Sequence, residues 1–369
     1  MTRSSKLFTL GVEEEFQIVD PTTRDLKPHV EQMLASGSEQ FIENIKREMI
    51  QSMVETVSPI CQDIHEARKE MIKLRSGLSD LARQSDLAIV GAGAHPFSRW
   101  QSQVITSQDR YRLLEEDLQD VVRSILIFGL HVHVGIPDRE LMIDIMNEVR
   151  YFLPHMLALS SNSPFWQGRV TGLKSYRTIV WQQFPRTGIP STFDSWSDFE
   201  RFVNLLIKTN CIDDGKKIWW DLRPHPYFNT LEFRVCDMPT SVDDGIMLVA
   251  LFQAIVAKLY KLRKNNLGFR QYDRALILEN KWRAARYGID GKLIDFGKQT
   301  EVPVRDLTVE LLEFVDDVVD ELGSREVVSH ALKILDSGTG ADRQMQIYEE
   351  TQDLNAVVDY LIAETVRFS

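Results

Sequence analysis

The stretch that decides the fold is GVEEEFQIVD, residues Gly11–Asp20. It has the apolar character of a β-strand, with three consecutive glutamates in its middle. Side chains of a strand alternate between faces, so Glu13 and Glu15 share one face and Glu14 lies on the other. Two carboxylates about 7 Å apart on one face repel each other unless a cation, a basic side chain or water separates them. Two explanations of the glutamates are therefore compatible with this stretch alone: a solvated strand edge, or a metal or substrate site.

The chain has 369 residues and a formal net charge of −11. Because a single hydrophobic core rarely serves more than ~250–300 residues, we expect one large domain with an appended part. The pattern predicts a mixed sheet core over residues 1–240 and a helical part over residues 241–369, within one catalytic domain. The negative charge argues against nucleic acid or an anionic membrane as the main partner.

The three cysteines include no CxxC pair, which suits a reducing compartment. The first residues, MTRSSKLFTLG, hold no apolar stretch long enough for a signal peptide. The most apolar run, residues 246–257, is too short for a membrane span and predicts a buried helix. We therefore expect a cytoplasmic protein.

Strands and helices alternate first, and helices dominate later. Strand patterns cover residues 125–136 and the end of 219–237, and helical spacing covers 61–86, 195–210 and most of the chain after 241. A helix after Pro137 should run to about residue 160 with a kink at Pro154. Residues 162–190 have the composition of an ordered functional loop. The order predicts an α+β fold, an antiparallel sheet with helices gathered on one side.

Two further strands also carry ionisable side chains on a single face. In LHVHVGI, His131 and His133 share one face, and in TLEFRVC, Glu232 and Arg234 share one face. Each strand alone is better explained by a solvated face. Together, as neighbours in a sheet, they would gather these side chains with Glu13 in one patch, and a divalent cation relieves the repulsion of packed carboxylates.

The balance of ligands favours Mg²⁺ or Mn²⁺, because carboxylates outnumber imidazoles. HxH with one carboxylate is the pattern of a Zn²⁺ site, which stays the alternative. Arg234 suits a phosphate or carboxylate, or a salt bridge to a neighbouring glutamate. Neither DGKK nor DGKL completes a P-loop, so any ATP must bind by another architecture.

Five motifs in order resemble the bacterial carboxylate–amine ligase family, also called glutamate–cysteine ligase type 2. They are GVEEEFQIVDP, GLHVHVGIPDRE, NSPFWQGRVTGLKSYR, LRPHPYFNTLEFRVCDMPT and ENKWRAARYG. The resemblance implies a glutamine-synthetase-like fold, in which a curved antiparallel sheet of about six strands holds ATP and metal ions on its open face. It also implies small-molecule substrates and a homo-oligomer, a homodimer or larger.

The resemblance also implies roles for single residues. Glu232 and Arg234 would be catalytic, with Arg234 on the substrate or the transferring phosphoryl group. Glu48 matches a further acidic position less well, because it differs in strand parity from Glu55 and needs a turn or bulge between them. Metal ligands would be Glu13, Glu15, Glu48, Glu55, His131 and Glu232. Substrate or phosphate contacts would be His133, Arg177, Arg186 and Arg223, and for the three arginines a structural role is an equal alternative.

The implied reaction is ATP-dependent amide formation through an acyl phosphate, between the γ-carboxyl of glutamate and cysteine or another amine. One alternative is a metal-dependent hydrolase that uses HxH and a carboxylate. Another is a relative that binds ligand without catalysis. Glu14 should not be a ligand, and a salt bridge under the sheet would explain it.

Overall fold

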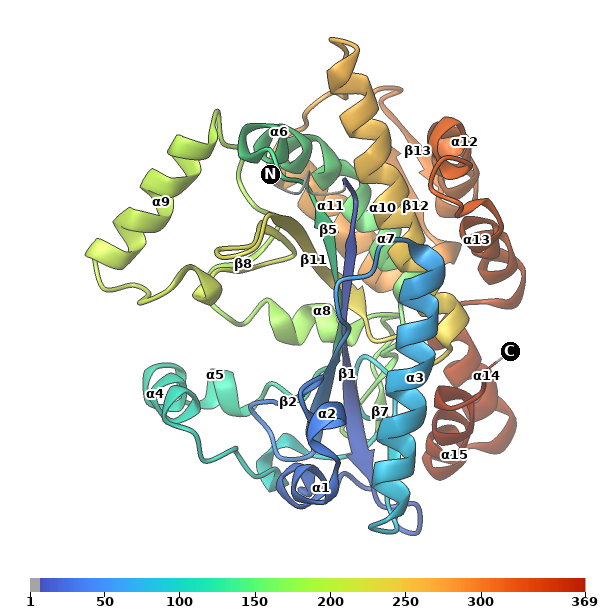
Figure 1. The fold of residues 1–369 in the computed structure, drawn as a ribbon. Coiled ribbons are helices and arrows are strands. Elements are labelled where there is room, and N and C mark those ends of the chain that lie inside the picture. The colour runs from blue at the N-terminus through green and yellow to red at the C-terminus, as the bar shows by residue number, and fades with distance from the viewer. Residues whose placement is uncertain (1–6, 369) are drawn as a thin grey trace.

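The computed structural model describes residues 7–368 and is built on a seven-stranded sheet (Figure 1). The strand order is β10-β11-β5-β1-β3-β2, with β4 paired to β1, and every pair is antiparallel. This confirms the predicted fold class. The strands are β1 (Leu10–Val19), β2 (Ile45–Arg47), β3 (Met53–Val57), β4 (Ala88–Val90), β5 (Gly129–Gly135), β10 (Leu222–Pro224) and β11 (Thr230–Asp237).

Helices cover the sheet unequally. Figure 1 shows α3, α10 and the four C-terminal helices on one side, whereas α4, α5, α8 and α9 border the other. The helices are α1 (Val30–Ser36), α2 (Glu39–Ile42), α3 (Ile64–Arg83), α4 (Asp109–Leu118), α5 (Asp120–Arg123), α6 (Arg139–Val149), α7 (Leu153–Ser160), α8 (Tyr176–Trp181), α9 (Trp196–Lys208), α10 (Val242–Lys264), α11 (Arg274–Tyr287), α12 (Val304–Val319), α13 (Arg325–Ser337), α14 (Gly340–Thr351) and α15 (Leu354–Thr365).

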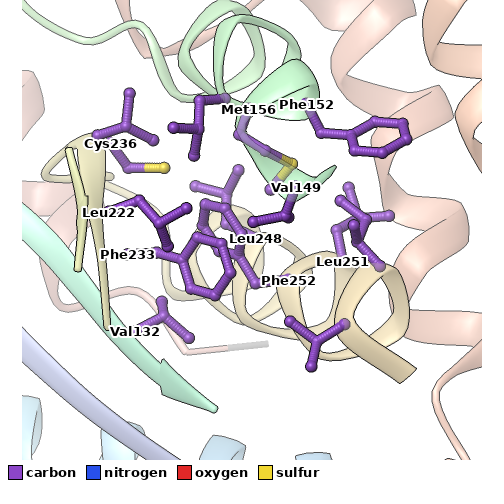
Figure 2. Packing of buried hydrophobic residues seen from close by; sticks show 14 of the residues in the cluster. Val132, Val149, Phe152, Met156, Leu222, Phe233, Cys236, Leu248, Leu251 and Phe252 are labelled. Atoms are coloured by element: carbon purple, nitrogen blue, oxygen red, sulfur yellow. The ribbon is translucent and has the colours of Figure 1, made fainter. Parts of the chain in front are cut away.

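The covered face of the sheet carries the predicted apolar side chains. Val12, Val132 and Phe233 are buried in one core cluster with residues of α7 and α10. Figure 2 shows this packing, in which the rings of Phe233 and Phe252 stack with their centroids 4.2 Å apart. Burying one face in this way commits the alternate side chains of β1, β5 and β11 to the opposite face.

Local sequence explains where several helices begin and end. Asp63 caps α3 by accepting hydrogen bonds from the backbone N–H groups of His65 and Glu66, and Ser195 caps α9. The helix expected after Pro137 is divided rather than kinked. A 3-10 turn at Arg150–Phe152 separates α6 from α7, and Pro154 stands in the first turn of α7, where its missing N–H costs nothing.

The helical part is not helical throughout. A hairpin of β12 (Lys292–Asp295) and β13 (Thr300–Pro303) follows α11, and α14 was not predicted. The loop region contains α8 and three two-residue strands, β6 (Phe165–Trp166), β7 (Arg169–Val170) and β8 (Thr187–Gly188), and β8 pairs with β9 (Trp219–Trp220). Helix α10 has the length and apolar composition of a membrane span, but 78% of its most apolar window is buried within the protein, as in the core helix predicted from the sequence.

Candidate active site

The open face of the sheet brings the predicted acidic and imidazole side chains together. In the β1–β5 ladder Glu13 is opposite His131, and His133 is opposite Gly11. Nδ1 of His131 lies 3.2 Å from a carboxylate oxygen of Glu13, and Nε2 of His133 lies 3.4 Å from the other. Glu13 therefore bridges both histidines.

Strand β3 and the turn before it add two more carboxylates. Glu15 is directly opposite Glu55 in the β1–β3 ladder. Glu48 follows β2 and precedes β3, so a turn separates it from Glu55, as the difference in parity required. Burial and the neighbouring Glu13 and Glu48 hold the pKa of Glu55 well above its usual range. Burial and the charge of Glu15 raise the pKa of Glu48 to about 8.

The third side of the site is a carboxylate held between two arginines. Glu232 accepts hydrogen bonds from Nε of Arg223 at 2.8 Å and from a terminal nitrogen of Arg234 at 2.6 Å. A β-bulge in β11 lies between Phe233 and Cys236, so Arg234 leaves the regular ladder with β5. Although burial opposes it, the charges of Arg223 and Arg234 hold the pKa of Glu232 well below its usual range.

The donor set fits a hard divalent cation. Two groups of three ligand atoms lie within 4.8 Å of one another: one from Glu13, Glu55 and His131, and one from Glu13, His133 and Glu232. Carboxylates dominate both groups, which is the chemistry of Mg²⁺ or Mn²⁺ sites. Burial, together with the neighbouring carboxylates, raises the pKa values of Glu48 and Glu55, and a bound cation would relieve this crowding. The residues are brought together as predicted, and their roles as ligands stay predictions.

Glu14 lies under the sheet, as expected. Its carboxylate accepts hydrogen bonds from Nη2 of Arg75 at 2.6 Å and from Nε at 3.0 Å, and both side chains are buried. Arg75 comes from α3 and also donates to the carbonyl of Thr240. Glu14 thus ties the core side of β1 to α3, and it is separated from the open face by the sheet itself.

The predicted arginine contacts divide into two kinds. Arg223 and Arg234 line the site, whereas the guanidinium of Arg177 donates to the backbone carbonyls of Arg234 and Val235 at 3.2 and 3.4 Å. Arg186 donates from Nε to the carbonyl of Lys217 and lies over the ring of Trp219. The contacts of Arg177 and Arg186 are those of structural arginines, and a direct contact with substrate stays a prediction for both.

Two pockets open from the carboxylate cluster and differ in character. A pocket of about 520 Å³ touches Glu13 and His133 and is otherwise lined largely by apolar groups, among them Ile60 and Phe228. A pocket of about 470 Å³ touches Glu48 and Glu55, and its other walls include Lys46, Arg47, Gln108 and Arg110. The cluster therefore lies between an apolar and a cationic recess.

Several of these lining residues were missed from the sequence. Arg110 lies at the start of α4, where its charge opposes the rise in the pKa of Glu48. Phe228 belongs to the turn between β10 and β11 and stacks on His225, with ring centroids 4.4 Å apart. The segment RPHPYFN around it, with two aromatic residues in a turn next to the Glu232 strand, is a signal that could have indicated a binding pocket.

Comparison with known proteins places the chain in a family. The family described as "Glutamate-cysteine ligase family 2 (GCS2)" matches residues 9–359. A protein of Solibacter usitatus (strain Ellin6076) with the provisional name glutamate–cysteine ligase 2 is 58% identical over 358 residues, which are 97% of this chain and 93% of that protein. A protein of the same provisional name from Roseiflexus sp. (strain RS-1) is 57% identical over 359 residues, 97% of this chain and 95% of that one.

Solved structures share the fold at much lower identity. The glutamate–cysteine ligase of Francisella tularensis, solved in complex with AMP, matches with a TM-score of 0.70 and 14% identity, over 99% of this chain and 90% of that one. At this identity the likeness establishes the fold. With the family match over nearly the whole described chain, it leads to one conclusion: this protein belongs to glutamate–cysteine ligase family 2.

Proposed function

We propose that this protein is an ATP-dependent ligase that joins a carboxylate to an amine through an acyl phosphate. The observation that carries the proposal is the convergence of Glu13, Glu55, His131 and Glu232 on one open sheet face, with Arg234 bound to Glu232. Membership of a ligase family supports the same reaction class. The AMP complex of the Francisella tularensis ligase supports a nucleotide as the phosphoryl donor.

The reaction needs activation because a carboxylate has no good leaving group. A carboxylate oxygen attacks the γ-phosphorus of ATP, the bond to the β-phosphate oxygen breaks, and ADP leaves. The amine nitrogen then attacks the acyl carbon, loses a proton, and inorganic phosphate departs as the amide forms. Neither step requires a nucleophile from the protein, so positioning and charge neutralisation are its main contributions.

Arg234 is the residue best placed to neutralise charge during transfer. Its guanidinium is buried at the cluster, where water screens it little, and Glu232 fixes its direction through the 2.6 Å hydrogen bond. Arg223 holds the other side of Glu232, which keeps that carboxylate in place. A donor held in advance in this way stabilises developing negative charge without reorganising.

Magnesium ions would be held by His131 and by five carboxylates, those of Glu13, Glu15, Glu48, Glu55 and Glu232. When bound, Mg²⁺ neutralises phosphate charge and orients the phosphate oxygens for in-line transfer. His133 orients Glu13 by its 3.4 Å contact and lies 3.0 Å from Oγ1 of Thr230, which fixes its ring.

The two pockets suit the two kinds of substrate. The apolar recess beside Glu13 and His133 offers Phe228 and Ile60 to the flat purine of ATP, whose phosphates would then reach the cluster. The cationic recess beside Glu55 offers Lys46 and Arg110 to a carboxylate-bearing substrate. The provisional names of the relatives support glutamate as the acid and cysteine as the amine, and other amines fit the same chemistry.

The hydrolase alternative is not favoured. Both histidines of the HxH motif contact Glu13, and Glu15, Glu55 and Glu232 also lie next to one or the other, so the site is richer in oxygen than a zinc hydrolase requires. The non-catalytic alternative is not favoured either. A relative that binds ligand without catalysis would be expected to have lost at least one metal carboxylate, and this chain keeps every carboxylate that matches the family's motifs.

The test is ADP release from Mg²⁺-ATP and glutamate, screened across amines. Product amide should form in equal amount to ADP. Glu55→Gln should be inactive and Asp80→Asn, a change of an exposed carboxylate on α3, should match the wild type. Folded protein that releases no ADP with any amine would overturn the ligase proposal. Turnover of an amide without ATP, restored by Zn²⁺, would favour the hydrolase.

A further inference from the structure

A buried ion pair lies beside the site and takes no part in the chemistry above. Lys281 of α11 and Asp221, which directly precedes β10, place Nζ and Oδ2 2.6 Å apart, and each side chain is 2% exposed. Lys281 belongs to ENKWRAARYG, a motif of the sequence to which the proposed reaction assigns no role.

Stability alone explains this pair poorly. Taking a lysine and an aspartate out of water is costly, and their attraction repays the cost only when the geometry is good. Apolar side chains of similar volume often stabilise a core as well or better. What such a pair adds is a fixed position for the chain segments that carry it.

Asp221 fixes the backbone of the proposed catalytic arginine. Its carbonyl accepts a hydrogen bond from the N–H of Arg234 at 2.8 Å, and its own N–H donates to the carbonyl of Gly188 at 2.9 Å. Arg234 lies in the bulge of β11, where the regular ladder with β5 is interrupted. The bulged residue therefore depends on Asp221 for a backbone partner on the β10 side.

Helix α11 also holds the segment on which the guanidinium of Arg234 rests. The carbonyl of Ala285 accepts hydrogen bonds from the N–H groups of Lys174 and Ser175 at 2.8 and 3.0 Å, just before α8. Trp181 of α8 places its ring under Arg234, with 5.6 Å from Cζ to the ring centroid. One helix thus secures both the backbone of Arg234 and the surface beneath its side chain.

We infer that Lys281, acting through Asp221, is a positioning residue that sets the place of Arg234 relative to the reacting phosphoryl group. The inference rests on the proposed ligase function. A displacement of a catalytic group by about 1 Å costs about a hundredfold in rate, so loss of the pair should lower kcat while leaving most of the ATP-binding surface intact.

The test uses the full-length protein and a variant that removes both charges, Lys281→Met with Asp221→Leu, so that neither partner is left charged and alone. Asp221→Glu is the second variant, because it keeps the charge and shifts the anchor by one methylene. Arg283→Gln is the matched control, since Arg283 lies on the same helix in exposed ion pairs with Glu279 and Glu301. Melting temperature, kcat, the KM for ATP and deuterium exchange of residues 230–237 are measured.

The inference predicts that the double variant keeps its melting temperature within a few degrees while kcat falls at least about tenfold, with the KM for ATP changed less than about twofold. Exchange should accelerate in residues 230–237 and not in α12 or α13. Wild-type kcat in a folded double variant overturns the inference, whatever the exchange shows. If the double variant does not fold, the kcat of Asp221→Glu decides in the same way. If the wild type releases no ADP, the ligase proposal fails, and unchanged exchange in residues 230–237 overturns the positioning role separately.

Discussion

Glu15 on β1 and Glu55 on β3 are directly opposite each other in an antiparallel ladder, on the face of the sheet that the helices leave open. Like charges placed opposite each other destabilise a sheet. Burial, the charges of Glu13 and Glu48 and, after these, the charge of Glu15 hold the pKa of Glu55 well above its usual range.

Magnesium should stabilise the protein more at alkaline pH than at acidic pH. The pKa of Glu48 is about 8 in the fold against 4.5 for the free side chain, so between these values the folded state keeps a proton that the unfolded state has lost. The contribution of Glu48 to the free energy of unfolding is therefore complete below pH ~4.5 and is lost as pH rises towards ~8. Without Mg²⁺, the melting temperature of the wild type should fall relative to Glu48→Gln between pH 5 and 8.5.

Added Mg²⁺ should restore the wild type at pH 8.5 and act little at pH 5. Glu43→Gln, at a nearby exposed position, is the control and should follow the wild type at every pH. Equal stabilisation by Mg²⁺ at both pH values would remove Glu48 from the cluster that the ion relieves.

Glu232→Gln should abolish ADP release while the protein stays folded. The amide keeps the shape of the side chain but loses the charge that directs Arg223 and Arg234, and the loss of one preorganised group of this kind costs about 10²–10³ in kcat. Steady-state ADP release and thermal melting check the two halves of the prediction. Unchanged turnover would exclude Glu232 from both the metal site and the catalytic machinery.

Glu14→Gln should weaken the fold rather than the chemistry. Removing one partner of a buried pair leaves the other charge uncompensated, at a cost of about 3–5 kcal/mol in the free energy of unfolding. Urea unfolding measures this, and Asp80→Asn, in an exposed pair with Arg83, should cost less than about 1 kcal/mol. A Glu14→Gln protein as stable as the wild type would contradict the role of Arg75 beneath the sheet.

Substitutions in the two pockets should change the KM values of different substrates. Phe228→Ala is expected to raise the KM for ATP about tenfold with little change in kcat, because it removes uniform binding of the purine. Arg110→Ala should instead raise the KM for the carboxylate substrate. Trp282→Ala, an exposed aromatic residue on α11, serves as control. If Arg110→Ala raised the KM for ATP instead, ATP would have to be assigned to the cationic pocket.

Alternation along strands accounts for what the sequence could predict. The separation of Glu13 and Glu15 from Glu14 follows from the period of two, and the structure places them on opposite faces. The turn needed between Glu48 and Glu55 also followed from parity. These features depend on local geometry that a single segment contains.

What could not be predicted depends on contacts between distant segments. The bulge at Arg234 is fixed by Asp221 and by Arg177, which reaches it from α8, and no local pattern in TLEFRVC signals it. The motif around Arg177 resembles the family, and a substrate contact stays a prediction; the sequence did not indicate that its guanidinium donates to the backbone carbonyls of Arg234 and Val235. The division between α6 and α7 begins at Arg150, four residues before Pro154, where the Arg150 guanidinium donates to the carbonyls of Pro190 and Tyr272.

The three consecutive glutamates of β1 also bear on how the chain avoids misfolding. If β1 slipped by one residue against its neighbours, Glu13 and Glu15 would turn towards the apolar interior, where Arg75 could neutralise one of them at most. Glu14 would then stand alone among the histidines. The wrong pairing is thus penalised by charge as well as by exposed apolar surface. The glutamates that form the proposed site therefore also help to select the correct register of β1.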